Sequence, residues 1–426
     1  MNAVFLQSII VIDTVLIAPL GVEALAALGL ASSFVGILNG MLLAFAAGTQ
    51  LLLAQAFGAE NKELQRQWFY SGLVINLMIA TLGLVFIFVF GNRALSLLAT
   101  NADMAKQAYV YLAFFSLAVI GVAVAQNLTV YFNSVGRSRV PFFSNLIELP
   151  VNALLSWVLI NGHLGLPAMG IAGAALGSGA AVLIRCVYLQ YVMRSQRLLV
   201  PNTQDAKTLR QTLALKAHFW QALPIAANFI TMVLSMNVCM MIYARLGVQQ
   251  FAALTLLLPW MRVAGNAATG WAQATGISVG QILGRSGRDY LDEFVARAWR
   301  VALCIALVVA CFYVSMYAFF DTLYPDLQEE TRDYLWQFLP LLLVLPFIRT
   351  SNTVCGHVLR AGGDAAYVFK VHASTQWLVT VPLSALFVLV FQLSVFWVFA
   401  LILLEESIKA IPFHRRLWGG QWKHKI

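Results

Sequence analysis

Charged side chains are scarce in this 426-residue chain: Asp, Glu, Lys and Arg make up only 11% of it, against about 25% in soluble domains. Hydrophobic residues make up 61%. So few charges cannot cover a folded domain in water, which excludes a soluble globular protein. Apolar runs of about 20 residues recur along the chain, the length that a helix needs to cross the bilayer core, whereas membrane strands would be shorter and alternating. We therefore expect an all-α integral membrane protein, embedded in the lipid bilayer.

The chain also lacks the motifs of several chemistries. Its five cysteines fall in apolar runs without CxxC spacing, so no disulfide framework or metal site is expected. Gly-rich stretches such as GSGAA (177–181) do not follow a strand, so they indicate no nucleotide-binding loop. No HExxH, Ser/His/Asp set or paired carboxylates suggest hydrolysis. We expect no enzyme, no cofactor and no ATP-binding domain, so transport would have to be driven by an ion gradient.

The formal net charge of +9 predicts an orientation in the membrane rather than a nucleic-acid partner. Twenty of the 27 Lys and Arg residues fall in segments that share one side if the N-terminus is inside, and four fall on the other side. This bias places both termini in the cytoplasm of a multi-pass protein of the plasma (inner) membrane. The chain starts inside an apolar run without a basic start or cleavage site, so we expect no cleavable signal peptide and a first helix that begins before Met1.

Twelve transmembrane helices are expected from the apolar runs. Their ranges are 1–18, 24–56, 68–91, 105–134, 140–161, 168–193, 217–245, 249–284, 297–320, 332–359, 366–391 and 393–412. The sequence also repeats itself, because LGVEALAAL (20–28) matches LGVQQFAAL (246–254), and AQAFGAE (54–60) meets GQILGRS (280–286) at the same offset. An even number of helices in each half gives parallel repeats, an arrangement typical of transporters.

The repeat predicts two six-helix lobes joined by one polar connection. We expect an N-terminal lobe at 1–195, a cytoplasmic linker at 196–216, and a C-terminal lobe at 217–426 that ends in a short basic tail. Two lobes with a cleft between them would suit alternating access to a small-molecule substrate. We expect the protein to act as a monomer.

A lone carboxylate stands out in the first helix, in VIDTVLIAPLG (11–21). An ionisable group at membrane depth is costly and is a functional hypothesis by default. Because burial disfavours the charged form of a carboxyl group, Asp13 is expected to hold or release a proton near neutral pH. The alternative is an acid that neighbouring hydroxyls merely satisfy.

A second set of polar residues follows one face of the helix at 140–161. Glu148, Asn152 and Ser156 are spaced i, i+4, i+8, which puts them on the same side. Ser178, in the small-residue run of the next helix, is expected to join them. With Asp13 these residues form the predicted ion-coupling site, although Ser and Asn also serve as packing groups between membrane helices.

The second half carries cations instead. The position that corresponds to Asp13 is Cys239, whereas Arg262 and Arg349 lie inside predicted helices. A buried arginine needs an anion. Arg349 could pair with Glu148 or Asp13 across the cleft, or with substrate, and Arg262 is better explained by snorkelling or a structural ion pair.

Three stretches together resemble multidrug and toxic compound extrusion (MATE) transporters. They are DTVLIAPLGVEALAALGLASS (13–33), LPVNALLSWVLINGHLGLPAMGIAGAALGS (149–178) and VLRAGGD (358–364). The resemblance covers essentially the whole chain. It implies two six-helix bundles forming a V with a substrate cavity, and export of bulky, often cationic or aromatic compounds in exchange for protons or sodium.

For the first lobe, the resemblance implies that Asp13 is the coupling acid and that Asn152 is the accompanying asparagine. In some members an aspartate follows four residues after that asparagine, where this chain has Ser156. A family hydroxyl position falls on Ser178. A sodium ion near Asp13 stays open as an alternative to protons.

For the second lobe, the resemblance places Met232 where some members have a glutamate, and Arg349 where some have an acid. Other members have a lysine there followed by an asparagine, which Arg349 and Asn352 resemble. A cation site in this lobe is therefore expected to be absent, which favours protons. Arg349, Asn352, Trp260 and Met232 are the candidate substrate-cavity residues, with Trp260 offering cation–π surface.

Taken together, these patterns predict a secondary antiporter that exports small organic compounds. The alternative is a flippase for a lipid-linked precursor, which should show a strongly basic central cavity for pyrophosphate. An intramembrane enzyme or a receptor would need active-site pairs or a soluble domain.

Overall fold

The structure, a computed structural model, describes residues 12–196, 214–325 and 327–424. Within these ranges it is helical without strands, which confirms the predicted all-α membrane class. Nine of the described helices are long and apolar enough to cross a membrane. Residues 1–11 of the first predicted helix and 197–213 of the predicted linker lie outside the described residues.

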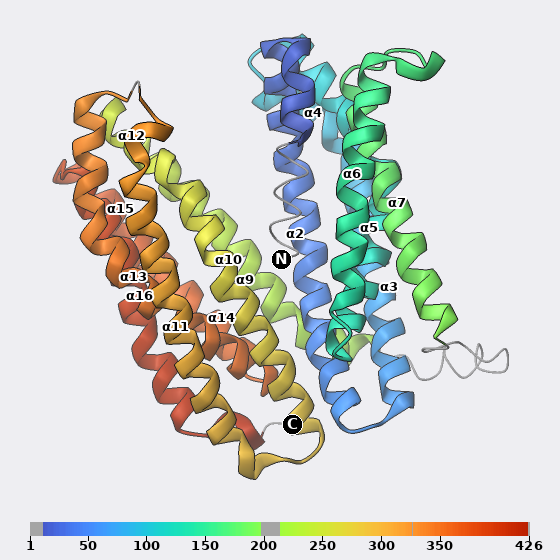
Figure 1. The fold of residues 1–426 in the computed structure, drawn as a ribbon, viewed down its shortest axis with the longest axis vertical. Helices are drawn as coiled ribbons and strands as arrows, with labels where there is room; N and C mark the ends of the chain where they lie inside the picture. The colour runs from blue at the N-terminus through green and yellow to red at the C-terminus, as the bar shows by residue number, and fades with distance from the viewer. Residues whose placement is uncertain (1–11, 197–213, 326, 425–426) are drawn as a thin grey trace. The chain divides into compact units, whose positions relative to one another are not determined.

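The chain divides into two compact units, Met1–Leu223 (unit 1) and Pro224–Ile426 (unit 2). In unit 1, helical residues 12–17 precede the main helices. These are α2 (Val22–Gly58), α3 (Lys62–Phe86) with its continuation through a π-turn at Ile87–Gly91 into α4 (Asn92–Leu98), α5 (Ala102–Ser134), α6 (Arg139–Asn161) and α7 (Ile171–Ser195). Within this unit α5 packs against α2, α3 and α7, and α6 packs against α7 (Figure 1).

Unit 2 contains most of α9 and the helices that follow it. They are α9 (Leu215–Tyr243), α10 (Val248–Gly284), α11 (Leu291–Ala318), α12 (Phe320–Leu323), α13 (Glu329–Ala361), α14 (Ala365–Thr375), α15 (Val381–Ala385) and α16 (Val395–Trp418). Within the unit α13 packs against α10, α11 and α16. Its apolar core includes Phe338 of α13 stacked on Phe399 of α16, with ring centroids 4.6 Å apart.

Short polar and glycine signals set several helix ends. The side chain of Asn61 accepts a hydrogen bond from the Leu64 backbone, and the side chain of Asn101 does the same for Met104, so each caps the helix that follows. Gly162 ends α6 with a φ of 75°, a conformation that favours glycine.

Several helices differ from their predicted ranges, and two of them contain π-turns. The helix expected at 68–91 begins at Lys62 because Asn61 caps it, and its continuation reaches Leu98. The helix expected at 366–391 is α14 and α15 joined by π-turns at Gln376–Thr380 and Leu386–Val390. A π-turn widens the helix locally and is often found where a polar side chain must be re-aimed.

The first residues of α9 pack within unit 1 against α2. His218 is fully buried and its Nε2 lies 2.9 Å from Thr49 Oγ1. Ala222 approaches Gly48 so closely that a Cβ on Gly48 would lie 2.6 Å from the Ala222 Cβ. The second lobe was expected to begin at 217, and these contacts explain why the compact units divide later, at Pro224.

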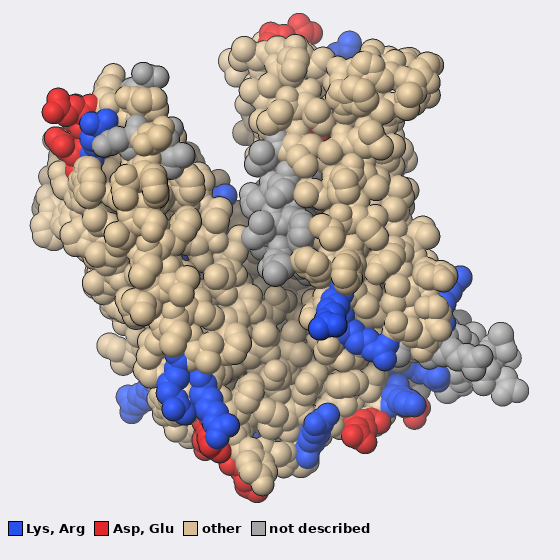
Figure 2. All heavy atoms as spheres, viewed as in Figure 1, with Lys and Arg blue, Asp and Glu red and all other residues tan. Residues whose placement is uncertain are grey.

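An uncharged surface covers the middle of each unit (Figure 2). In unit 1 the visible Lys and Arg side chains gather toward the end where α2 turns into α3. In unit 2 they gather toward the end where α10 turns into α11. A largely uncharged belt with most of the visible basic residues toward one end is the pattern of a membrane-spanning unit.

Candidate functional site

Asp13 is buried in unit 1 among hydroxyl and amide groups. Its side chain is 4% exposed. Ser178 of α7 donates a hydrogen bond to Asp13 Oδ2 at 2.8 Å, and Ser156 of α6 donates a longer one to Oδ1 at 3.4 Å. Asn152 Nδ2 donates to the Ser178 hydroxyl at 2.8 Å. The structure thus brings together four of the five residues of the predicted coupling site.

Close packing of α6 and α7 holds this cluster together. The small-residue run in α7 lets the two backbones meet. A Cβ on Gly177 would lie 2.5 Å from the Ser156 backbone nitrogen, and one on Gly173 would lie 2.5 Å from the Leu159 carbonyl carbon. Only residues without a Cβ permit this approach, which is why membrane helix interfaces favour them. The glycines therefore set the distance between Ser156 and Ser178.

Tyr111 of α5 completes the surroundings and was not predicted. It is 4% exposed, and its phenol lies beside the Ser178 hydroxyl and within electrostatic reach of Asp13. The Asn152 side-chain oxygen is buried and has no hydrogen-bond partner among the described residues. A single carboxylate, an amide oxygen and hydroxyl groups form an all-oxygen donor set, which suits a proton or a hard cation such as sodium.

Glu148, the fifth predicted coupling residue, belongs to a different cluster. It is 3% exposed and forms an ion pair with Arg185 of α7, with Oε2 3.1 Å from Nη1. Arg185 also donates from Nη2 to Thr129 of α5 at 3.0 Å. Arg185 was overlooked, although a cation in the middle of the apolar stretch VLIRCVYL (182–189) was a visible signal.

In unit 2, the counterpart of Asp13 is uncharged. Cys239 is 4% exposed, and its thiol contacts the Ser384 hydroxyl at 3.9 Å. Tyr243 shares a hydrogen bond of 2.8 Å with the same hydroxyl. No carboxylate takes part in the hydrogen bonds found at this position among the described residues.

Two acids of α16 in unit 2 lie around a buried lysine. Lys409 Nζ lies 2.9 Å from both Glu405 Oε1 and Glu406 Oε1. The remaining oxygens accept hydrogen bonds at 2.9 Å, Glu405 Oε2 from Thr380 and Glu406 Oε2 from Asn352. Lys409 lies within α16, which continues beyond the predicted end at 412 to Trp418, and it is 4% exposed.

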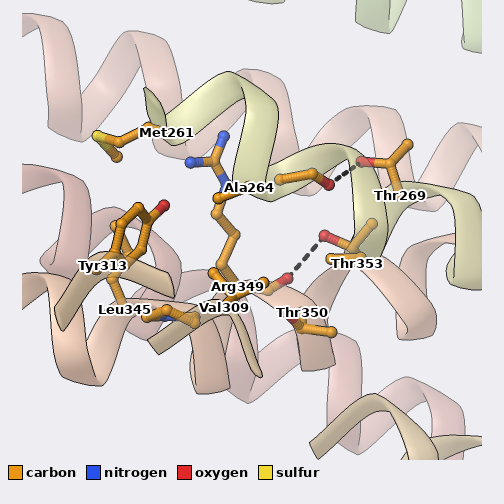
Figure 3. A pocket seen from close by; sticks show the side chains of 12 residues that line it. Met261, Ala264, Thr269, Val309, Tyr313, Leu345, Arg349, Thr350 and Thr353 are labelled. Atoms are coloured by element: carbon orange, nitrogen blue, oxygen red, sulfur yellow. Dashed lines mark hydrogen bonds between the residues drawn. The ribbon is translucent and has the colours of Figure 1, made fainter. Parts of the chain in front are cut away.

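A cavity of about 60 Å³ in unit 2 is lined by α10, α11 and α13 (Figure 3). Of the four predicted cavity residues, only Arg349 lines it. Asn352 bonds Glu406, Trp260 donates to the Tyr324 hydroxyl at 3.3 Å, and Met232 is a 44% exposed residue of α9.

Comparison with known proteins gives a consistent result. A model of the MatE family matches residues 1–158 and 224–386. The "Probable multidrug resistance protein NorM" of Agrobacterium fabrum is 23% identical over 384 residues, covering 87% of this chain and 81% of that protein. The "Uncharacterized transporter YisQ" of Bacillus subtilis is 22% identical, covering 97% and 90%.

Solved structures agree on the fold. The crystal structure of MATE in the bent conformation superposes with a TM-score of 0.85 at 16% identity, covering 97% of this chain and 92% of that one. At this identity the likeness concerns the fold alone.

Proposed function

Because the chain belongs to the MatE family of multi-pass membrane transporters, we propose that it is a secondary antiporter that exports small organic compounds across the inner membrane, with both termini cytoplasmic. Several curated relatives bear the name of multidrug resistance proteins, which supports this class of substrate. A lipid-precursor flippase is not favoured, since the cavity of unit 2 has a single cationic side chain in its lining, and a pyrophosphate would call for more.

Asp13 is the proposed coupling residue, and the observation that carries this proposal is its environment. The carboxylate is buried, receives hydrogen bonds from uncharged donors and forms no ion pair among the described residues. A buried acid without a fixed counter-charge binds a proton or cation from solution more readily than one already neutralised. Glu148 lacks this property, because Arg185 already neutralises it.

Protons are the proposed coupling ion. In unit 2 the ammonium group of Lys409 already lies between the two acids, where a sodium ion would otherwise bind. Ion binding at Asp13 and substrate binding would each favour a different conformation, which is the thermodynamic requirement for exchange.

The test is accumulation of ethidium, a fluorescent cation, inside everted membrane vesicles, which corresponds to export from the cell, under separately imposed proton and sodium gradients. We expect a proton gradient to drive export by the wild type and Asp13→Asn to abolish it while the protein still folds. Glu63→Gln, which removes an exposed acid in the first turn of α3, is the matched control and should export normally. Export driven by sodium alone would refute the ion assignment. Asp13→Asn export at the wild-type rate would refute the coupling site.

A further inference from the structure

Arg349 is an exposed cation that forms no ion pair with any residue that the structure describes. It follows the apolar run LPLLLVLPFI (339–348) in α13, well inside a helix long enough to cross the membrane. No ion pair or side-chain hydrogen bond of its guanidinium is found among the described residues; only its backbone carbonyl is used, by Thr353 at 2.7 Å. A charged arginine at membrane depth persists only where it meets an anion or lines a wet cavity.

Apart from Asp13, the proposed coupling residue of unit 1, the buried acids described above already have cationic partners. Glu148 is held by Arg185. Arg349 interacts electrostatically with Glu406. The two carboxylate oxygens of Glu406, however, already accept hydrogen bonds from Lys409 and Asn352. The positive charge of Arg349 is therefore left for something that the chain does not supply.

The cavity around Arg349 is suited to an anion. Its twelve lining residues include no Asp or Glu, and Arg349 is the only charged one among them. In Figure 3 the Arg349 guanidinium extends between Met261 and the α10 backbone at Ala264, and the hydroxyl of Tyr313 points into the same space. Tyr313 is 3% exposed, and no hydrogen bond of its hydroxyl is found among the described residues.

Two of the three threonines that line the cavity use their hydroxyl protons within their own helices. Thr269 donates its hydroxyl proton to the Gly265 carbonyl at 3.0 Å, and Thr353 donates to the Arg349 carbonyl. The guanidinium of Arg349 and the phenol of Tyr313 thus remain available as donors to a ligand. A guanidinium and a phenol side by side match the two oxygens of a carboxylate.

The volume of the cavity limits the size of the ligand that it can bind. A volume of about 60 Å³ is several times the ~10–15 Å³ that one water molecule requires. It can hold an acidic group but not a whole drug-sized molecule. The apolar wall formed by Met261, Val309 and Leu345 suits the first carbons next to that group.

We propose that Arg349 and Tyr313 bind the carboxylate of an organic acid, so that this cavity accepts amphiphilic carboxylates. The inference rests on the proposed export function for its biological meaning, and it adds an acidic substrate class to that function. Binding itself can be measured without transport.

The experiment is calorimetric titration of the purified full-length protein with 1-naphthoate and, as a probe of matched shape and opposite charge, with 1-naphthylmethylammonium. We expect naphthoate to bind the wild type, and Arg349→Gln to weaken it tenfold or more, because a charge-assisted pair is lost. Arg349→Lys should retain part of the affinity, and Tyr313→Phe should lose several-fold. Arg262→Gln, which removes the same charge from α10 outside the cavity lining, is the control and should bind normally.

Thermal unfolding of each variant verifies that it is folded. Equal naphthoate affinity in Arg349→Gln and the wild type would overturn the proposal, as would equal losses in Arg262→Gln and Arg349→Gln. Naphthoate binding without ethidium export would leave the site standing and refute the export function. Asp13-dependent ethidium export without naphthoate binding would support the export function and refute the carboxylate site.

Discussion

Replacement of Gly177 by alanine tests whether the contact between α6 and α7 positions the Asp13 cluster. The new Cβ would lie 2.5 Å from the Ser156 backbone nitrogen, whereas ordinary contacts begin at 3.4 Å. Because the obstructing atoms belong to the backbone, no side-chain rotation can relieve the clash. The helices must separate locally by the difference, 0.9 Å.

That displacement is enough to open the cluster. The bond from Asn152 to Ser178 crosses the same interface and would lengthen from 2.8 to 3.7 Å, beyond hydrogen-bonding distance. The hydrogen bond from Ser156 to Asp13 is already 3.4 Å long, so any further separation would break it. Overpacking costs about 1–3 kcal/mol and each lost hydrogen bond about 1 kcal/mol. Alanine has a helix propensity about 1 kcal/mol better than glycine, so a net destabilisation of about 2–4 kcal/mol remains.

The assay is thermal unfolding of the purified protein together with ethidium export in vesicles. Gly36→Ala is the control, since a Cβ there meets no atom within 4 Å and should leave stability unchanged or slightly higher. We expect Gly177→Ala to unfold at lower temperature and to export slowly. If Gly177→Ala melts like Gly36→Ala and exports at the wild-type rate, the reasoning about this interface is refuted.

Two further predictions concern buried charges. Arg185→Leu should destabilise by about 3–5 kcal/mol, since it leaves Glu148 buried without a partner, and the double variant with Glu148→Leu should recover part of the loss; strictly additive shifts in unfolding temperature would contradict this. Lys409→Met should also destabilise, and sodium chloride, compared with choline chloride, should raise the variant's unfolding temperature by filling the space between the acids. An equal salt response of variant and wild type would disprove that account.

The architecture could be predicted from sequence because the bilayer imposes helix length and composition. The scarcity of charge and the recurring apolar runs led to the all-α class that the structure confirms. Helix ends were harder to predict, because they depend on single side chains. Asn61, for example, starts α3 six residues before the apolar run. Periodicity also cannot reveal π-turns like Gln376–Thr380, because the composition does not change there.

The part of the site that lies on one face of a single helix could be predicted from the sequence. The i, i+4 relation placed Asn152 and Ser156 on one face, and the structure puts both beside Ser178. Spacing within one helix does not identify a partner on another helix, so the pairing of Glu148 with Arg185 was missed.

Tyr111 and the α16 acids were missed for other reasons. A tyrosine in an apolar run resembles any core aromatic residue. Glu405, Glu406 and Lys409 did carry a signal, since i+4 and i+3 spacing of opposite charges inside a predicted span indicates a buried ion pair.

The packing of α9 against α2 has a consequence for the division of the chain into halves. A cut within 197–213 would separate the two sequence repeats, yet the C-terminal piece would carry away His218 and Ala222, which cover Thr49 and Gly48 of the other piece. The N-terminal fragment alone would expose that part of α2. Two co-expressed fragments would have a specific surface by which to recognise each other. The genetic duplication and the folding unit therefore have different borders, and a gene split at the linker would yield mutually dependent halves.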